Sequence, residues 1–247
     1  MNYHNPYQQN PHRIGPAKTS YVIKLIIFLT LLISLSSTIL TPFFKTNYFV
    51  YYLGLSLEGI KNYFFWQLVT YNFIESGNGL SLGYIFQLLF NLYLLWVMGT
   101  TVIERTSRLK FIFLFFSSII FSGLVALITM HLTNKNIIFA GSNIGLFSIL
   151  VAWMMLNSKE TRIFLFFILP IKAYWIVLGL IGLNLLSNFS NMQMVPFFTT
   201  LTVSLYSYFY SVVIWNRFSP LDHLNRMERY LIYTSRRISS KFNRKDH

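Results

Sequence analysis

The sequence predicts an all-α membrane protein with six transmembrane helices, and three observations lead to this fold class. Of the 247 residues, 54% are hydrophobic and only 11% are charged, whereas charged residues make up about 25% of an average soluble domain. Apolar runs recur along the chain at lengths near the roughly 20 residues that a helix needs to cross a bilayer. The basic residues are concentrated on one side of these runs, as in other multi-pass proteins.

The chain begins with a polar segment, a first apolar run and a mixed loop. Residues 1–20 are rich in Asn, Gln and Pro, which predicts a disordered tail. The apolar run 21–44 is too long for the core of a signal peptide and ends at Lys45, which predicts a retained span. Residues 46–79 mix aromatic residues with charges and glycine, so we expect a long, half-buried first loop.

Five more spans are predicted at 80–102, 109–130, 141–156, 173–186 and 194–215. Two of them, 141–156 and 173–186, are short and must be enclosed by the other helices. Residues 163–171 are apolar but precede Lys172, and we expect them at the membrane interface. A count of five or seven spans is the alternative. The predicted membrane domain is therefore 21–216, followed by a basic tail at 217–247.

The distribution of Lys and Arg predicts that both termini face the cytoplasm. With six spans and both tails inside, only Lys45, Lys61 and Lys135 of the 20 Lys and Arg residues lie outside. The even number of spans and this bias support each other. Residues 219–222 form a helix-start pattern, with Ser219 as the cap and Pro220 at the first position. The helix that follows is basic and amphipathic, typical of contact with anionic lipid or of docking onto a partner protein.

Composition also excludes several classes of function. The chain has no cysteine, so no disulfide or thiolate site operates, and the sequence offers no metal-binding or cofactor-binding motif. The spans contain almost no ionisable residue, which disfavours a proton or ion pathway. A net charge of +13 is compatible with nucleic acid, but the cations lie in tails and short connections, so we expect no nucleic-acid partner.

Three motifs, in order along residues 60–215, resemble the rhomboid family. Trp66, Gln67 and Thr70 resemble a first-loop motif of Trp, Arg and Thr, with Gln67 in place of the Arg. The run 86–105 resembles the second span of that family. It retains Asn91, Gly99, Glu104 and Arg105, whereas Gln87 stands where the family has His. Residues 166–173 are similar to the connection Phe-Phe-x-x-Pro-x-Lys-Ala before the fifth span.

The resemblance implies a Ser nucleophile in the fourth span and a His base in the sixth, and both positions differ here. In the favoured register the motif Gly-x-Ser-Gly falls on Gly141 to Ile144, which places Asn143 at the nucleophile. A shift of one residue places Ser142 there instead and loses other matches. Thr200 stands where the His is expected, and no His occurs in spans four to six. A serine hydroxyl needs a neighbouring base.

Three hypotheses follow for function. The first is a catalytically inactive rhomboid-like protein that binds transmembrane clients or membrane partners without cleaving them. The second is an active intramembrane serine protease that uses Ser142 with His131 or Lys135 as an improvised base. The third is a structural subunit of a membrane complex that docks through its basic tail. The frequent use of Asn, Lys, Ile and Phe favours a bacterial inner membrane, with the endoplasmic reticulum as the alternative.

Overall fold

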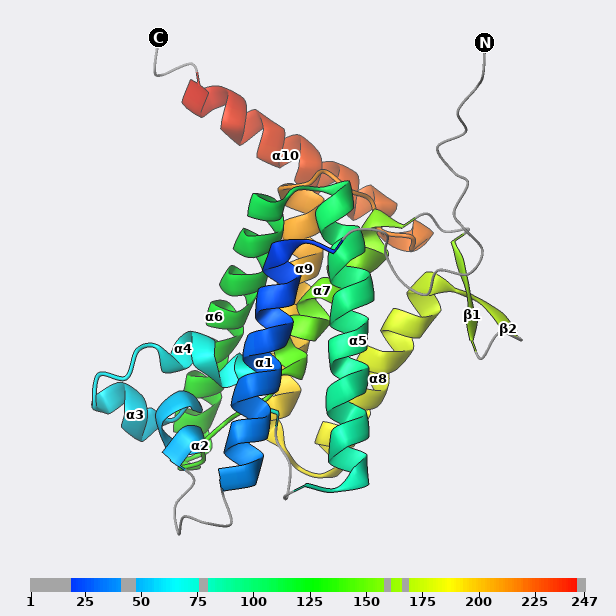
Figure 1. Cartoon of the computed structure of the whole chain (residues 1–247). Coiled ribbons are helices and arrows are strands. Elements are labelled where there is room, and N and C mark those ends of the chain that lie inside the picture. Colours follow the sequence, from blue (N-terminus) through cyan, green and yellow to red (C-terminus); the bar gives the residue numbers. More distant parts are fainter. Residues whose placement is uncertain (1–18, 41–47, 76–79, 158–160, 166–168, 244–247) are drawn as a thin grey trace.

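The computed structural model describes residues 19–40, 48–75, 80–157, 161–165 and 169–243. The predicted tail thus lies outside the described residues except for Thr19 and Ser20, as do Lys45 and residues 166–168 of the third motif. The long helices are α1 (Tyr21–Leu40), α5 (Leu82–Arg105), α6 (Arg108–Leu132), α7 (Asn143–Leu156), α8 (Ala173–Ser190) and α9 (Met194–Val213). Figure 1 shows them as a bundle with both described termini near one end.

Within the described residues, four helices are long and apolar enough to cross a membrane: α1, α5, α6 and α8. The prediction of a helical membrane protein is therefore confirmed, whereas the six-span count rests on α7 and α9. Helix α7 has only 14 residues, and nearly all of its side chains are buried, as expected for a helix that is apolar on every side. Helix α9 is rich in Tyr, Ser and Thr and packs against α6, α7 and α8.

Hydroxyl groups join the three central helices of the bundle. Ser148 Oγ on α7 lies 2.9 Å from Ser118 Oγ on α6 and 2.9 Å from Ser207 Oγ on α9, and all three side chains are buried. Small residues permit such close packing of helices. At Gly99 on α5, an added Cβ would lie 2.7 Å from Cδ1 of Ile23 on α1, so this retained glycine sets the close approach of α1 to α5.

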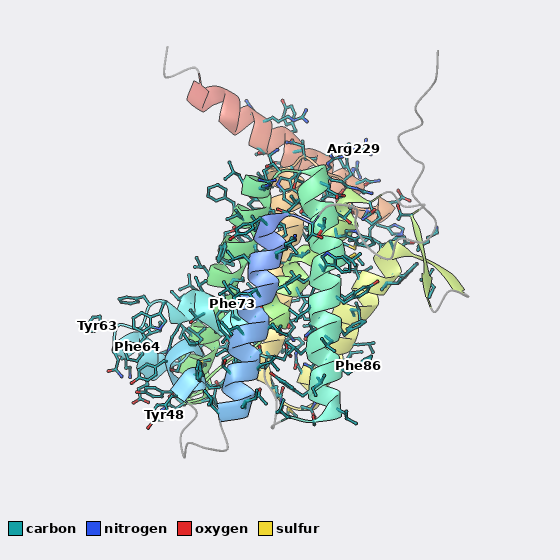
Figure 2. All side chains as sticks on the ribbon, viewed as in Figure 1. Tyr48, Tyr63, Phe64, Phe73, Phe86 and Arg229 are labelled. Carbon is teal, nitrogen blue, oxygen red and sulfur yellow. The ribbon has the colours of Figure 1, made fainter. Side chains whose placement is uncertain are left out.

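The predicted first loop contains three short helices and one 3-10 turn. These are α2 (Tyr48–Leu53), α3 (Leu57–Lys61), α4 (Gln67–Thr70) and η1 (Tyr71–Phe73). Figure 2 shows Tyr48, Tyr63 and Phe64 at the margin of the molecule, whereas Phe73 lies against α1. In agreement, Tyr63 is 76% exposed and Phe73 only 6%. The loop is therefore half-buried, with its later residues in the bundle.

Between α7 and α8 the chain forms a hairpin of β1 (Arg162–Leu165) and β2 (Leu169–Lys172), paired antiparallel with Arg162 opposite Lys172. The described residues of the apolar segment that we expected at the interface, 163–165 and 169–171, thus lie in two strands. Hairpin and basic helix lie at the same end of the bundle in Figure 1.

The C-terminal helix begins later than the sequence predicted. A 3-10 turn, η2 (Asp222–Leu224), precedes α10 (Asn225–Asn243), so Ser219 is not the cap. Its hydroxyl accepts a hydrogen bond from Leu221 N at 3.3 Å, and its own N–H donates to Glu228 Oε2 at 3.1 Å. Glu228 is fully buried and also accepts from Tyr208 Oη at 2.6 Å. This inward carboxylate, which the capping pattern ignored, fixes the start of α10 against α9.

Candidate functional site

Side chains of the first-loop motif hold the loop in shape. Trp66 Nε1 donates to Tyr52 O at 2.9 Å, and Thr70 Oγ1 donates to Leu53 O at 2.7 Å. Gln67 is fully buried; its Nε2 donates to Tyr51 O at 2.9 Å and its Oε1 accepts from Ser56 N at 3.2 Å. The Gln that replaces an Arg in the family pattern thus satisfies backbone groups that would otherwise be buried without partners.

The end of the first loop is fastened to the start of α7. Asn72 Oδ1 accepts a hydrogen bond from Gly145 N at 2.7 Å. A Cβ at Gly145 would lie 2.5 Å from Cε2 of Phe115 and 2.9 Å from Nδ2 of Asn72. Tyr71 O accepts from Gly141 N at 3.1 Å. Because Gly145 has no side chain, Asn72 can lie against the start of α7. The loop residues that follow Asn72 are thereby placed inside the bundle.

This arrangement brings Glu75 to the centre of the site. Its side chain is only 4% exposed. Oε1 accepts a hydrogen bond from Gln87 Nε2 at 2.6 Å, and Oε2 accepts from Asn91 Nδ2 at 3.2 Å and from the hydroxyl of Ser142. The backbone N–H of Glu75 donates to Ser34 Oγ on α1 at 2.9 Å. The carboxylate of Glu75 thus connects α5 to the residue before α7, and its backbone N–H adds a contact with α1.

The electrostatic environment of Glu75 differs from that of a surface glutamate. Burial raises the pKa of its carboxyl, and the hydrogen bonds from Ser142, Asn91 and Gln87 act in the opposite direction. All three donors are neutral side chains. Desolvation favours the protonated acid, whereas these donors favour the carboxylate. Glu75 lies outside the helices that cross the membrane, between η1 and α5.

Three positions at which the chain departs from the family pattern line one pocket. Gln87, Asn143 and Thr200 border it together with Glu75 and the retained Gly141. Asn188 and Gln193 add two further amides. Thr200 Oγ1 donates to Asn184 Oδ1 on α8 at 3.0 Å. We call the set Glu75, Gln87, Asn143, Asn188, Gln193 and Thr200 the polar pocket.

The two improvised bases do not join Ser142. His131, in the last turn of α6, and Lys135 line a different pocket, with Glu58 and Lys61 of the first loop. The hydrogen bond that Ser142 donates goes to Glu75. Among the described residues that line the polar pocket, none is Lys, Arg or His. The structure therefore groups Gln87, Asn91, Asn143, Ser142 and Thr200 and leaves His131 and Lys135 apart.

The neighbouring residues Glu104 and Arg105 differ in the contacts that they make. Arg105 Nη1 donates to Leu156 O at 2.7 Å and to Asn157 Oδ1 at 2.9 Å, which ties the end of α5 to the end of α7. Glu104 is exposed. Of the retained family positions, Trp66, Thr70, Gly99 and Arg105 thus make contacts that hold elements together.

A cleft adjoins the polar pocket between α5, α7 and α8. It shares Gln87 and Asn143 with the pocket, and its remaining walls combine apolar side chains with the amides of Asn91 and Asn184. Helix α8 contributes Leu180, Leu183 and Asn184 to the lining. We call this space the α5–α8 cleft. Phe86, labelled at the beginning of α5 in Figure 2, is 74% exposed.

Sequence reasoning missed Glu75. It lies in a segment without hydrophobic periodicity and was counted only as a charge of the first loop. One signal was available, since Glu75 directly follows the apolar residues Phe73 and Ile74 and comes shortly before the predicted second span. An acid placed between an apolar segment and a span is a candidate for burial.

Comparison with known proteins gives one family. The family model described as the Rhomboid domain matches residues 63–218 of the 247. That range begins in the first loop and ends after α9, so it includes the polar pocket and the α5–α8 cleft. No curated protein matches the chain significantly.

Proposed function

This chain belongs to the rhomboid family, and from that premise we propose that it binds transmembrane segments of client proteins without cleaving them. It is an integral membrane protein with apolar helices of membrane-spanning length. In this proposal the protein binds the transmembrane segment of a client and acts on the client through that binding alone.

The observation that carries this proposal is the position of the Glu75 carboxylate. Acyl transfer from a peptide needs a serine whose proton can leave and neutral donors that are free to stabilise the oxyanion. Here Ser142 donates its hydroxyl hydrogen to Glu75, and the amides of Gln87 and Asn91 donate to the same carboxylate. Glu75 therefore engages both the hydroxyl that would have to attack and the amides that would have to stabilise the oxyanion.

The α5–α8 cleft supports the binding part of the proposal. It is lined by Leu, Phe and four amide side chains from three helices. Apolar walls suit the side chains of a client helix, and amides within a membrane form interhelical hydrogen bonds.

The test is a cleavage assay with purified protein in liposomes. We expect no cleavage of a panel of single-span substrates, and we expect those segments to bind the protein in the same liposomes. Cleavage that disappears in Ser142→Ala would contradict the proposal. Asn143→Ala serves as the matched variant at the neighbouring position.

A second candidate function rests on the contact between Ser142 and Glu75. A carboxylate in hydrogen-bond contact with a serine hydroxyl is a possible general base, so Glu75 replaces His131 and Lys135 as the base of an active serine hydrolase. This version requires Ser142 to react with a serine-directed fluorophosphonate and requires Glu75→Gln to abolish that labelling. Absence of labelling in the wild type removes the candidate.

We further propose the orientation given by the charge bias, with α10 on the cytoplasmic side of a bacterial inner membrane. The exposed cations Arg226, Arg229 and Arg236 lie on α10. Lys61 is the exposed cation of the first loop. In Figure 1 α10 and the first loop lie towards opposite ends of the bundle, as the positive-inside rule requires for this assignment.

A further inference from the structure

The polar pocket has an asymmetric chemistry. Its polar lining consists of one carboxylate, four amides and one hydroxyl, and none of its described lining residues is basic. Amide and carboxylate oxygens accept hydrogen bonds, and a carboxylate also attracts positive charge. This lining therefore favours a positively charged ligand group that donates hydrogen bonds.

Glu75 receives hydrogen bonds only from neutral side chains in the contacts described above. Neutral donors solvate a buried carboxylate in part, whereas a cation compensates its charge directly. The donors Gln87 and Asn91 are amide side chains on one face of α5, one turn apart. Both lie at the border of the α5–α8 cleft, so an incoming group in the cleft reaches the side of Glu75 that they cover.

The position of the pocket along the bundle restricts where that cation can lie. Gln87 is in the second turn of α5, Asn143 begins α7, Asn188 is in the last turn of α8, and Gln193 precedes α9. The pocket thus lies towards the helix ends that face away from α10 (Figure 1). A client helix in the cleft would contact Glu75 near its own end and not at its middle.

We propose that Glu75 selects clients whose transmembrane segment carries a Lys or Arg within about two turns of the membrane surface at this end. The inference rests on the proposed function and adds its specificity. The basic side chain of the client enters from the α5–α8 cleft. Its positively charged group displaces the amides of Gln87 and Asn91 from the Glu75 carboxylate. The amide oxygens of the polar pocket accept the remaining hydrogen bonds of that group. A lone basic residue is costly in a bilayer, which makes such a segment a suitable client.

The test compares two synthetic transmembrane peptides that differ in one residue. One carries Lys at the sixth residue from the end of its apolar segment, and the other carries Leu there. Both are titrated against labelled wild-type protein in nanodiscs, with energy transfer as the readout. We expect the Lys peptide to bind at least about tenfold more tightly, since close charge pairs at interfaces are worth about 1.5 kcal/mol or more.

Two variants make the comparison specific. Glu75→Gln should remove the preference for Lys, so that the two peptides bind this variant with equal affinity. The control is Glu104→Gln, at an exposed acid near the C-terminal end of α5, and this variant should keep the preference. Equal affinity of the two peptides for the wild type overturns the inference and leaves the proposed function standing, whereas absence of binding by either peptide overturns the proposed function itself.

A second measurement does not depend on any variant folding. A membrane-permeant carbodiimide joins a carboxyl group to an amine in contact with it, so the Lys peptide should become linked to wild-type protein through Glu75. Mass spectrometry of the linked peptides identifies the carboxyl group. A link to Glu104 or Glu58 in place of Glu75 would overturn the inference.

Discussion

At Glu75 the folded protein keeps an acid in a place where its charged form is poorly solvated. Burial raises the pKa of this carboxyl, so the folded state binds the proton more tightly than the unfolded chain does. Such a group makes a favourable contribution to the free energy of unfolding, and this contribution is fully present below the ordinary pKa of a glutamate. That stability is lost as the pH rises through the raised pKa.

Replacing Glu75 by Gln should therefore change how stability depends on pH. We expect the melting temperature of Glu75→Gln minus that of the wild type, measured in detergent, to increase between pH 4 and pH 8. The reason is that the variant has no charge to desolvate at high pH. Glu104→Gln, at an exposed position, is the control and should show no such trend. A difference that is constant over this pH range would contradict the assignment.

Two glycines form a matched pair for packing. Gly145→Ala should destabilise the protein by about 1–3 kcal/mol, because its Cβ would lie 2.5 Å from Phe115. Gly179→Ala should be neutral or stabilising by up to about 1 kcal/mol, because nothing lies within 4 Å of that position. Both values can be measured by unfolding in mixed detergent micelles. Similar effects at the two positions would show that contact with Phe115 and Asn72 does not matter.

Residues on helices were easier to predict than those in the loop. Gln87 and Asn91 are four residues apart in the predicted second span, a spacing that places both on one face of a helix, and both donate to Glu75. The partner itself was not predicted, since its position depends on the fold of the whole first loop and on the fit of Gly145 against Phe115. Neither has a signature in local sequence pattern.

At the scale of elements, enclosure decides which helices need to be long or strongly apolar. Helix α7 is short, and its neighbours cover nearly all of its side chains, as the shortness of the run 141–156 predicted. The start of α10 was predicted too early. The pattern at Ser219 was treated as a cap, whereas the buried carboxylate of Glu228 organises that turn.

Glu228 should control whether α10 stays on the bundle. Its carboxylate accepts from Tyr208 and from the N–H of Ser219, and loss of hydrogen bonds to a buried charged group costs about 1.5–3 kcal/mol each. Glu228→Ala should therefore release α10 and accelerate tryptic cleavage at Arg226 and Arg229. The control is Tyr230→Ala, at a side chain 71% exposed. Unchanged digestion of Glu228→Ala would contradict a docking role.

At the scale of the whole molecule, membrane embedding was predictable because it depends on sums over many residues. Hydrophobic content and the one-sided distribution of Lys and Arg tolerate local errors. The number of spans is more sensitive to local errors, because it depends on single helices such as α9. The Tyr, Ser and Thr residues of α9 lower its apolarity. Packing against α6 and α7 compensates, and this compensation exists only in the assembled bundle.

The proposed orientation can be tested because the chain lacks cysteine. In intact bacterial cells, a membrane-impermeant maleimide should label Lys61→Cys in the first loop and should fail to label Arg229→Cys on α10. Both side chains are exposed in the fold, so a difference in labelling reports the side of the membrane. Lysed cells should label both. The reverse pattern in intact cells would invert the topology.

Under the proposed function, the contact between Glu75 and Ser142 also affects how proteolysis could arise in this protein by substitution. A Thr200→His substitution would supply an imidazole and remove the hydrogen bond to Asn184, yet Ser142 would still contact a carboxyl group that also engages Gln87 and Asn91. We therefore expect this substitution alone to bring no hydrolytic activity, so selection would have nothing to favour until Glu75 is replaced as well. The buried acid would in this way oppose the stepwise evolution of a protease.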